Sequence, residues 1–409
     1  MVPPLAPNRL RRWVTYASLA VFVGALALPG LAQLARFDRR ATIAENRTLA
    51  PPPVWPDGWT GLLAWPAQAD AWLRDHFGFR ARLLRANTRL RYALFHETPN
   101  RQVLFGRHDR LFLSSRDGGR PGVLIADICG VRKSPADIDA AAEGIRTLLH
   151  AAAADAPEAL FVSVPSAPAV YPEDLPDWLV RQCVGPNSVQ RVMQRLEADP
   201  ALASRVVYPL ATLLAAKASG RVVPRYNFHW SGRGAEPTAA MIAEAKLGLH
   251  RAVEIPVREQ TADSDLSGMV PGLTLRDRIV VPDFAAAGVQ YCYARPECLP
   301  GLEDMAGVIG DYGRTLSPGA GTRRLLLLGD SFASFIAPWF GAYFGEVRQI
   351  STNYLDRLSV AERGRLRAVL FGSYRPDAVI FLYLDGGIFY APDQLTRMLW
   401  PPPALASVR

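Results

Sequence analysis

Ser331 is the side chain of this sequence best placed for nucleophilic chemistry. It follows four consecutive leucines, residues 325–328, and then Gly329 and Asp330. An uninterrupted apolar run of this kind is typical of a strand buried on both faces of a parallel sheet. Because the apolar residues after Ser331 recur at helical spacing, the serine is predicted at a strand-to-helix turn that resembles a nucleophile elbow. The alternative is an ordinary turn in which Asp330 or Ser331 only caps the helix.

A histidine suited to activate this serine lies in the segment Tyr226–Trp230. His229 and Asn227 alternate there, so their side chains point the same way if the segment is extended. An imidazole beside a side-chain oxygen is the base and orienting acceptor that a serine nucleophile needs. The alternative is a structural histidine that stacks beside Trp230.

Strands and helices alternate along most of the chain, which indicates an α/β fold. Apart from the leucine run, segments typical of strands lie at residues 160–164, 205–208, 347–351 and 378–382. Helical patterns separate these strands, and the alternation predicts a parallel sheet with helices on both faces. Two short apolar runs between residues 102 and 113 predict a hairpin ahead of this sheet.

The N-terminal region has the features of a membrane anchor. Residues 13–35 carry no charge, and arginines lie on both sides of them. The run is long enough to span a bilayer, for which about 20 apolar residues are needed. It is predicted to be an uncleaved signal-anchor in the inner membrane, with the basic N-terminus in the cytoplasm and everything after Arg36 in the periplasm. The alternative is a cleaved signal peptide with Ala25-Leu-Ala27 at its cleavage site.

This interpretation divides the chain into three regions. Residues 1–36 form a cytoplasmic tail and the anchor helix, residues 37–64 a proline-containing extended tether, and residues 65–409 the catalytic domain. A tether rich in proline is expected to be extended.

Four cysteines, an even number, fit an oxidising compartment and predict two disulfides. Cys292 and Cys298 are close in sequence within a proline-containing loop, so they are expected to pair, which leaves Cys129 for Cys183. Neither a Cys-x-x-Cys motif nor a histidine cluster is present, and no metal site is predicted.

The net charge of the chain does not indicate a particular class of binding partner. Its formal net charge is +8, from 46 basic and 38 acidic residues. Because the arginines are scattered among acidic residues, no stripe for nucleic acid is formed, and no nucleic-acid partner is expected.

Several motifs, in order, resemble one family. They are Glu45-Asn-Arg with Leu49-Ala-Pro51, Asp75-His-Phe-Gly-Phe-Arg80, Val103-Leu-Phe-Gly106, Val170-Tyr-Pro-Glu173, Asn227-Phe-His-Trp230, Leu328-Gly-Asp-Ser-Phe332 and Arg375-Pro-Asp-Ala-Val-Ile380. Together they resemble the periplasmic alginate O-acetyltransferases and related cellulose-acetylation proteins, which have an SGNH-hydrolase-like fold. The resemblance covers residues 45–382.

The resemblance implies catalytic roles for three residues. Ser331 matches the nucleophile of the family and His229 matches its base. The aspartate that orients the base in the family falls on Asn227. In serine proteases the corresponding loss of charge lowers turnover by about 10⁴. Two further departures lie at Ser166-Ala167, where the family tends to have Asn-Lys, and at Leu384–Gly386, where a Glu-Arg pair is expected.

The resemblance implies an O-acetyltransferase that acts on an exported polysaccharide through an acetyl-serine, without a cofactor. The acetyl group is expected from a membrane-bound O-acyltransferase partner. Backbone N–H groups after Ser331, with Asn353 as a second donor, are expected to hold the oxyanion. Two alternatives remain: a polysaccharide-binding or scaffold subunit whose site is weakened by Asn227, and an acetyl esterase.

Overall fold

The computed structural model describes residues 7–35, 49–115, 123–129, 133–181, 183 and 186–401. These residues form two compact units. One unit contains Met1–Asn100 and Ser267–Thr274, and the other contains Arg101–Leu266 and Leu275–Arg409. The first part of the predicted tether, residues 37–48, lies outside the described residues. The predicted domain boundaries stay a prediction.

The first unit consists of helices α1 (Pro7–Leu34), α2 (Trp59–His76) and α3 (Arg80–Phe95), together with the short turn η4 (Ser267–Met269). Within α1, Arg11–Gln33 is long and apolar enough to cross a membrane. The chain breaks between α2 and α3, near Gly78.

The second unit is built on a sheet of seven described strands. Their order is β4 (Val206–Val207), β3 (Glu158–Val164), β11 (Ala378–Leu384), β9 (Arg324–Gly329), β10 (Glu346–Ser351), β8 (Tyr312–Leu316) and β7 (Gln290–Tyr293). The strands from β4 to β10 are parallel, whereas β8 near one edge pairs antiparallel with both β10 and β7. The predicted α/β fold is confirmed. The antiparallel edge was not predicted.

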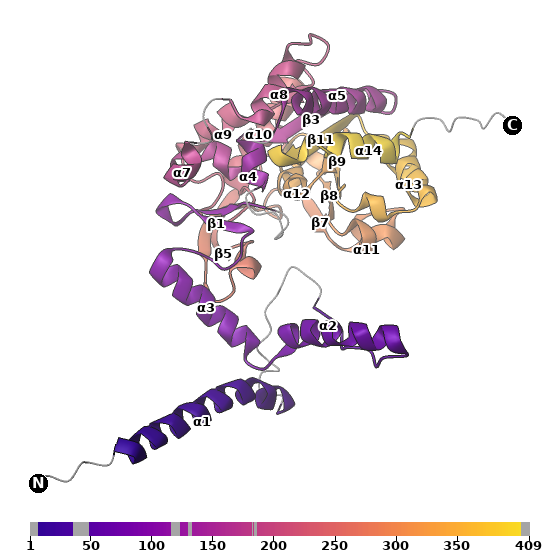
Figure 1. Ribbon diagram of the computed structural model, residues 1–409. Coiled ribbons are helices and arrows are strands. Elements are labelled where there is room, and N and C mark those ends of the chain that lie inside the picture. Colours follow the sequence, from indigo (N-terminus) through magenta and orange to yellow (C-terminus); the bar gives the residue numbers. More distant parts are fainter. Residues whose placement is uncertain are drawn as a thin grey trace, which may run out of the picture. The chain divides into compact units, whose positions relative to one another are not determined.

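Helices cover both faces of this sheet (Figure 1). One face carries α5 (Pro135–Ala152), α8 (Ser188–Glu197), α13 (Val360–Arg367) and α14 (Ala391–Leu399); the other carries α9 (Leu210–Lys217), α10 (Gly232–Met241) and α12 (Ser331–Ile336). The leucines of β9 alternate between the two cores: Leu326 and Leu328 pack into the first, Leu325 and Leu327 into the second. Because both faces of the strand are covered, an uninterrupted apolar run is favoured there.

The remaining described elements are short. Two antiparallel pairs are β1 (Val103–Phe105) with β2 (Leu111–Leu113), the predicted hairpin, and β5 (Val257–Asp263) with β6 (Arg276–Pro282). The short helices and turns are α4 (Val123–Ile128), α6 (Ala167–Val170), α7 (Asp177–Val180), α11 (Ala306–Ile309), η1 (Arg107–Asp109), η2 (Pro172–Asp174), η3 (Ile242–Lys246), η5 (Pro296–Cys298), η6 (Glu303–Met305), η7 (Pro318–Ala320), η8 (Ala337–Ala342), η9 (Leu355–Arg357), η10 (Ala368–Ser373) and η11 (Asp385–Gly387).

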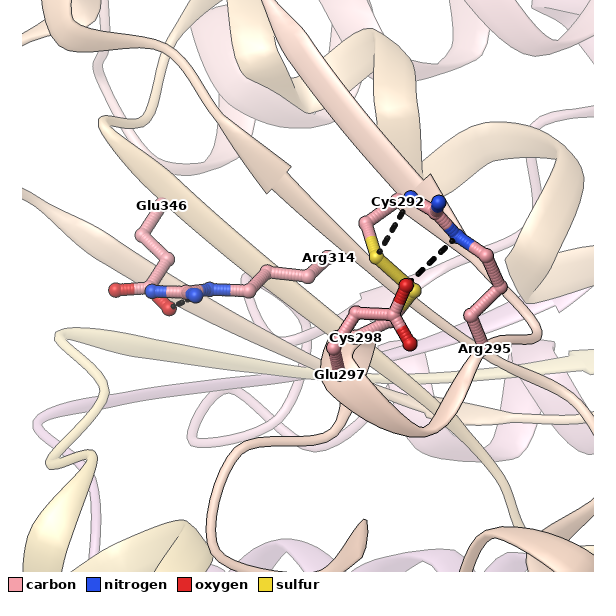
Figure 2. The surroundings of a disulfide bond; sticks show 6 residues. All are labelled: Cys292, Arg295, Glu297, Cys298, Arg314 and Glu346. Atoms are coloured by element: carbon pink, nitrogen blue, oxygen red, sulfur yellow. Dashed lines mark hydrogen bonds and ion pairs between the residues drawn. A yellow bond between two sulfur atoms is a disulfide. The ribbon is translucent and has the colours of Figure 1, made fainter.

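Both predicted disulfides are present, Cys129–Cys183 and Cys292–Cys298. Figure 2 shows the second of them, which closes the turn between β7 and η5 beside the Arg314–Glu346 ion pair. The two bonds close loops of very different length, because their cysteines are 54 and 6 residues apart.

Removing the long-range disulfide should destabilise the fold more than removing the short-range one. In the chain-entropy model, replacing Cys129 and Cys183 with serine lowers the free energy of unfolding by about 4 kcal/mol, and replacing Cys292 and Cys298 lowers it by about 2 kcal/mol. Urea unfolding of the two double variants beside the wild type measures both losses. Equal losses, or a larger loss for the short loop, would contradict the loop-length argument.

Candidate active site

The turn after β9 presents Ser331 at the carboxyl edge of the sheet. A side chain at Gly329 would place its Cβ 1.9 Å from the carbonyl oxygen of Leu382, so the turn requires glycine. Asp330 is buried and caps α12: its Oδ1 accepts from the N–H of Phe332 at 3.0 Å. Its Oδ2 accepts from the N–H of Leu384 at 2.8 Å, which ties the turn to the end of β11. Asp330 is therefore the residue that caps α12. Ser331 does not serve as the cap and contacts His229 instead.

Ser331 and His229 are brought together as the sequence predicts. The Oγ of Ser331 lies 2.7 Å from Nε2 of His229. The imidazole stacks on the ring of Phe335, with 4.6 Å between ring centroids and 14° between the planes. Its side chain is only 17% exposed, so the ring is held in place and largely shielded from water.

The acceptor on the other imidazole nitrogen is Asp265, which the sequence interpretation missed. Oδ2 of Asp265 lies 2.7 Å from Nδ1 of His229. The same carboxylate accepts the backbone N–H groups of Phe228 at 2.8 Å and His229 at 3.0 Å. These bonds fix the carboxylate against the segment that carries the histidine.

The prediction that Asn227 orients the imidazole is therefore corrected. Within the described residues, Oδ1 of Asn227 is buried without a hydrogen-bond partner. The segment around Asn227 is not a strand, so the alternation that places both side chains on one side does not apply. A carboxylate from elsewhere in the chain takes the expected place of the missing aspartate.

The β5–β6 ribbon delivers Asp265 to this position. Asp265 lies in the loop just after β5, and Ser264 beside it donates its Oγ hydrogen to the carbonyl of Tyr226. From β6, Asp277 accepts the backbone N–H groups of Arg225 and Tyr226. The segment that carries His229 is thus joined to the ribbon by Asp277 of β6 and by Ser264 and Asp265, which lie just beyond β5.

A cavity of about 320 Å³ opens beside Ser331. Its lining consists of Leu113, Phe228, Asp330, Ser331, Thr352, Asn353, Tyr354, Tyr383, Leu384, Tyr390, Ala391, Gln394, Leu395 and Met398. Asn353 reaches this cavity because β10 lies beside β9 in parallel, with Ser351 paired to Gly329. The place of Asn353 suits an oxyanion donor, and that role stays a prediction.

The two other departures from the family motifs contact each other. Oδ2 of Asp385 accepts from both the backbone N–H and the Oγ hydroxyl of Ser166, each at 2.9 Å. Oδ1 of Asp385 accepts the N–H of Gly386 at 2.8 Å. Burial raises the pKa of Asp385 to about 7, although these hydrogen bonds favour the ionised form.

No protein-family model matches the chain, and no curated protein matches it. Similar solved structures include Bacillus cereus PatB1 with a sulfonyl adduct, at 15% identity and a TM-score of 0.46, covering 70% of this chain and 96% of that one. The O-acetyltransferase domain of Pseudomonas putida AlgJ is 16% identical, with a TM-score of 0.41 and coverage of 73% and 98%. A DHHW family protein from Eubacterium siraeum is 14% identical, with a TM-score of 0.43 and coverage of 62% and 87%.

Proposed function

We propose that this protein transfers an acetyl group to a hydroxyl group of an exported polysaccharide through an ester on Ser331. The observation that supports this most directly is the series Asp265–His229–Ser331, in which both hydrogen-bond distances are 2.7 Å. A carboxylate, an imidazole and a serine hydroxyl in this order form the arrangement that activates serine for acyl transfer.

In the first step, Nε2 of His229 takes the proton of Ser331 while Oγ attacks the carbonyl carbon of the acetyl donor. The tetrahedral intermediate then collapses, the bond to the leaving group breaks, and the imidazolium returns the proton to that group. Asp265 accepts the Nδ1–H hydrogen bond, which leaves Nε2 free as the base, and its charge stabilises the imidazolium.

In the second step, the same imidazole removes the proton of a sugar hydroxyl, and the sugar oxygen attacks the acetyl-serine. Collapse of this intermediate releases the acetylated sugar and restores Ser331. Water in place of the sugar would release acetate, so access to the cavity decides between transferase and esterase. The N–H groups of Phe332 and Ala333, which follow Ser331, are already bonded to Asp330, so the expectation that they hold the oxyanion is corrected. The backbone N–H of Ser331 and the side chain of Asn353 are the proposed oxyanion donors in both steps.

The proposed location is the periplasmic side of the inner membrane. The apolar stretch Arg11–Gln33 supports an anchor, and the two disulfides suit an oxidising compartment. We propose that a membrane-bound O-acyltransferase supplies the acetyl group to Ser331 there.

The scaffold alternative loses its main support. It depended on a site weakened by Asn227, whereas the hydrogen bond to His229 is made by the carboxylate of Asp265.

The proposal is tested with an activated acetyl ester as donor and two acceptors, cellohexaose and a mannuronate oligosaccharide. Acetylated sugar formed by the wild type, and not by Ser331→Ala, would support transfer. Release of acetate alone would favour the esterase. Equal turnover by wild type and Ser331→Ala would overturn the proposal.

An aromatic ring of the cavity should contribute to acceptor binding. Tyr354 lines the cavity and is 43% exposed, and Arg357 covers its ring at 4.3 Å from the centroid. The ring offers an apolar surface for a sugar face. Tyr354→Ala is expected to raise the acceptor KM about tenfold, or about 1.4 kcal/mol. The kcat should change little, because the ring binds ground state and transition state alike.

Tyr354→Phe is the matched control, because it keeps the ring and removes only the hydroxyl. Its acceptor KM should stay close to that of the wild type. Steady-state kinetics with varied acceptor measure both variants. If Tyr354→Phe loses as much binding as Tyr354→Ala, the hydroxyl and not the ring is responsible.

A further inference from the structure

Asp385 is a fully buried carboxylate that the acyl-transfer steps do not use. It lies at the carboxyl end of β11, one residue beyond the last pair of the β11–β3 register, Leu384 with Val164. Its Oδ2 receives two hydrogen bonds from Ser166, which follows β3. The side chain therefore joins the loops that leave two neighbouring strands at the edge where Ser331 lies.

The segment that follows Asp385 builds one wall of the cavity beside Ser331. Seven of the lining residues come from β11 and this segment: Tyr383, Leu384, Tyr390, Ala391, Gln394, Leu395 and Met398. Successive turns carry the chain from Asp385 to this wall. The N–H of Ile388 donates to the carbonyl of Asp385 at 3.4 Å, and the N–H of Tyr390 donates to that of Gly387 at 3.3 Å.

This segment has little room to shift. A Cβ at Gly386 would lie 2.4 Å from Cδ1 of Leu124, and Ile388 is completely buried. On the other side of Asp385, the N–H of Leu384 is bonded to Asp330, the cap of the nucleophile turn. The hydrogen bonds of Asp385 are thus well placed to set the position of the cavity wall relative to Ser331.

Only a carboxylate satisfies all three donors around this position. Two N–H groups and one hydroxyl point at the two oxygens of Asp385. An amide would offer one oxygen and would turn its own N–H₂ group toward a backbone N–H. A buried donor without an acceptor raises the free energy of the folded state, so an aspartate with a serine partner is favoured at this position.

We infer that Asp385 and Ser166 are positioning residues for the acceptor: their hydrogen bonds hold the cavity wall formed by the Leu384–Met398 segment in the shape that binds the sugar. This inference rests on the proposed function. It assigns Asp385 no contact with the reacting atoms, so it predicts a defect in acceptor binding and not in acetylation of Ser331.

The test compares Ser166→Ala with Ser163→Ala. Both serines are buried near the end of β3, but the hydroxyl of Ser163 has no hydrogen-bond partner among the described residues. Two measurements are made at a pH above the pKa of Asp385. One is the amide hydrogen exchange of residues 386–398, and the other is the steady-state kinetics with cellohexaose or the mannuronate oligosaccharide. Asp385→Asn is measured in the same way if it folds.

Ser166→Ala is expected to speed exchange in residues 386–398 and to raise the acceptor KM about tenfold, because a hydrogen bond to a charged group is lost. Ser163→Ala should match the wild type in both measurements. The rate at which the activated ester acetylates Ser331 should be unchanged in both variants. Equal exchange and equal KM in the two serine variants would overturn the inference, as would a fall in Ser331 acetylation that matches the loss in transfer. If the wild type does not acetylate Ser331 at all, the proposed function fails, and the exchange measurement still decides whether the pair positions the wall.

Discussion

Asp265→Asn is expected to lower the kcat of acetyl transfer by about 10⁴, the size of the effect in serine proteases that lose the same charge. An asparagine at this position has two defects. Its amide group can turn its N–H₂ toward Nδ1 of His229, which would favour the wrong tautomer of the imidazole. It also carries no charge to stabilise the imidazolium that forms when Ser331 gives up its proton.

The matched control for this prediction is Asn227→Asp. With Asp265 already on Nδ1, a second carboxylate at 227 should not raise the rate. Because Oδ1 of Asn227 is buried without a partner in the described structure, the variant should instead lose stability through a buried, unpaired charge. Turnover of an activated acetyl ester and urea unfolding measure the two effects. A large gain in rate for Asn227→Asp, with little loss for Asp265→Asn, would return the orienting role to residue 227.

Ser331→Ala is expected to lower kcat by on the order of 10⁶, as for the loss of the nucleophile in other serine enzymes. The variant removes the only atom on which the proposed acetyl ester forms. Residues that act as a unit show strongly non-additive losses. The double variant Ser331→Ala with Asp265→Asn should therefore be no slower than Ser331→Ala alone.

Single-turnover and steady-state assays of the three variants provide this comparison. A double variant that is slower than Ser331→Ala by the full factor of the Asp265 change would show that Asp265 acts independently of the serine. Such a result would contradict the proposal that the carboxylate, the imidazole and the serine hydroxyl act as one unit.

The parts of this structure that the sequence predicts are those with a local pattern. Four leucines between Arg324 and Gly329 predict a strand covered on both faces, because only a central parallel strand buries every side chain in turn. The turn after it predicts the place of Ser331 between a strand and a helix. The disulfides follow from an even number of cysteines and a short loop between Cys292 and Cys298.

Asp265 could not be predicted in the same way, because its place depends on a long-range arrangement. It is 36 residues beyond His229 in the chain, at the end of a two-stranded ribbon whose strands are not predicted from the sequence pattern. The acidic run Asp263-Ser-Asp265 is visible in the sequence, but no spacing rule links it to the histidine.

The contact between Ser166 and Asp385 illustrates the same limit. In the sequence they are two separate departures from the family motifs, 219 residues apart. The parallel pairing of β3 with β11 brings both to the same edge of the sheet. Ser166 and Asp385, which look like two separate losses of family residues, therefore form one buried interaction.

The central claim is that Ser331 carries the acetyl group, and trapping that ester tests it most directly. The wild type is mixed with 4-nitrophenyl acetate, quenched in acid at short times, digested and analysed by mass spectrometry. We expect one acetyl group on Oγ of Ser331, formed much more slowly in Asp265→Asn and removed when acceptor oligosaccharide is added before the quench. A digest in which Ser331 stays unmodified while the ester is turned over, or in which the acetyl group is found on another residue, would contradict it.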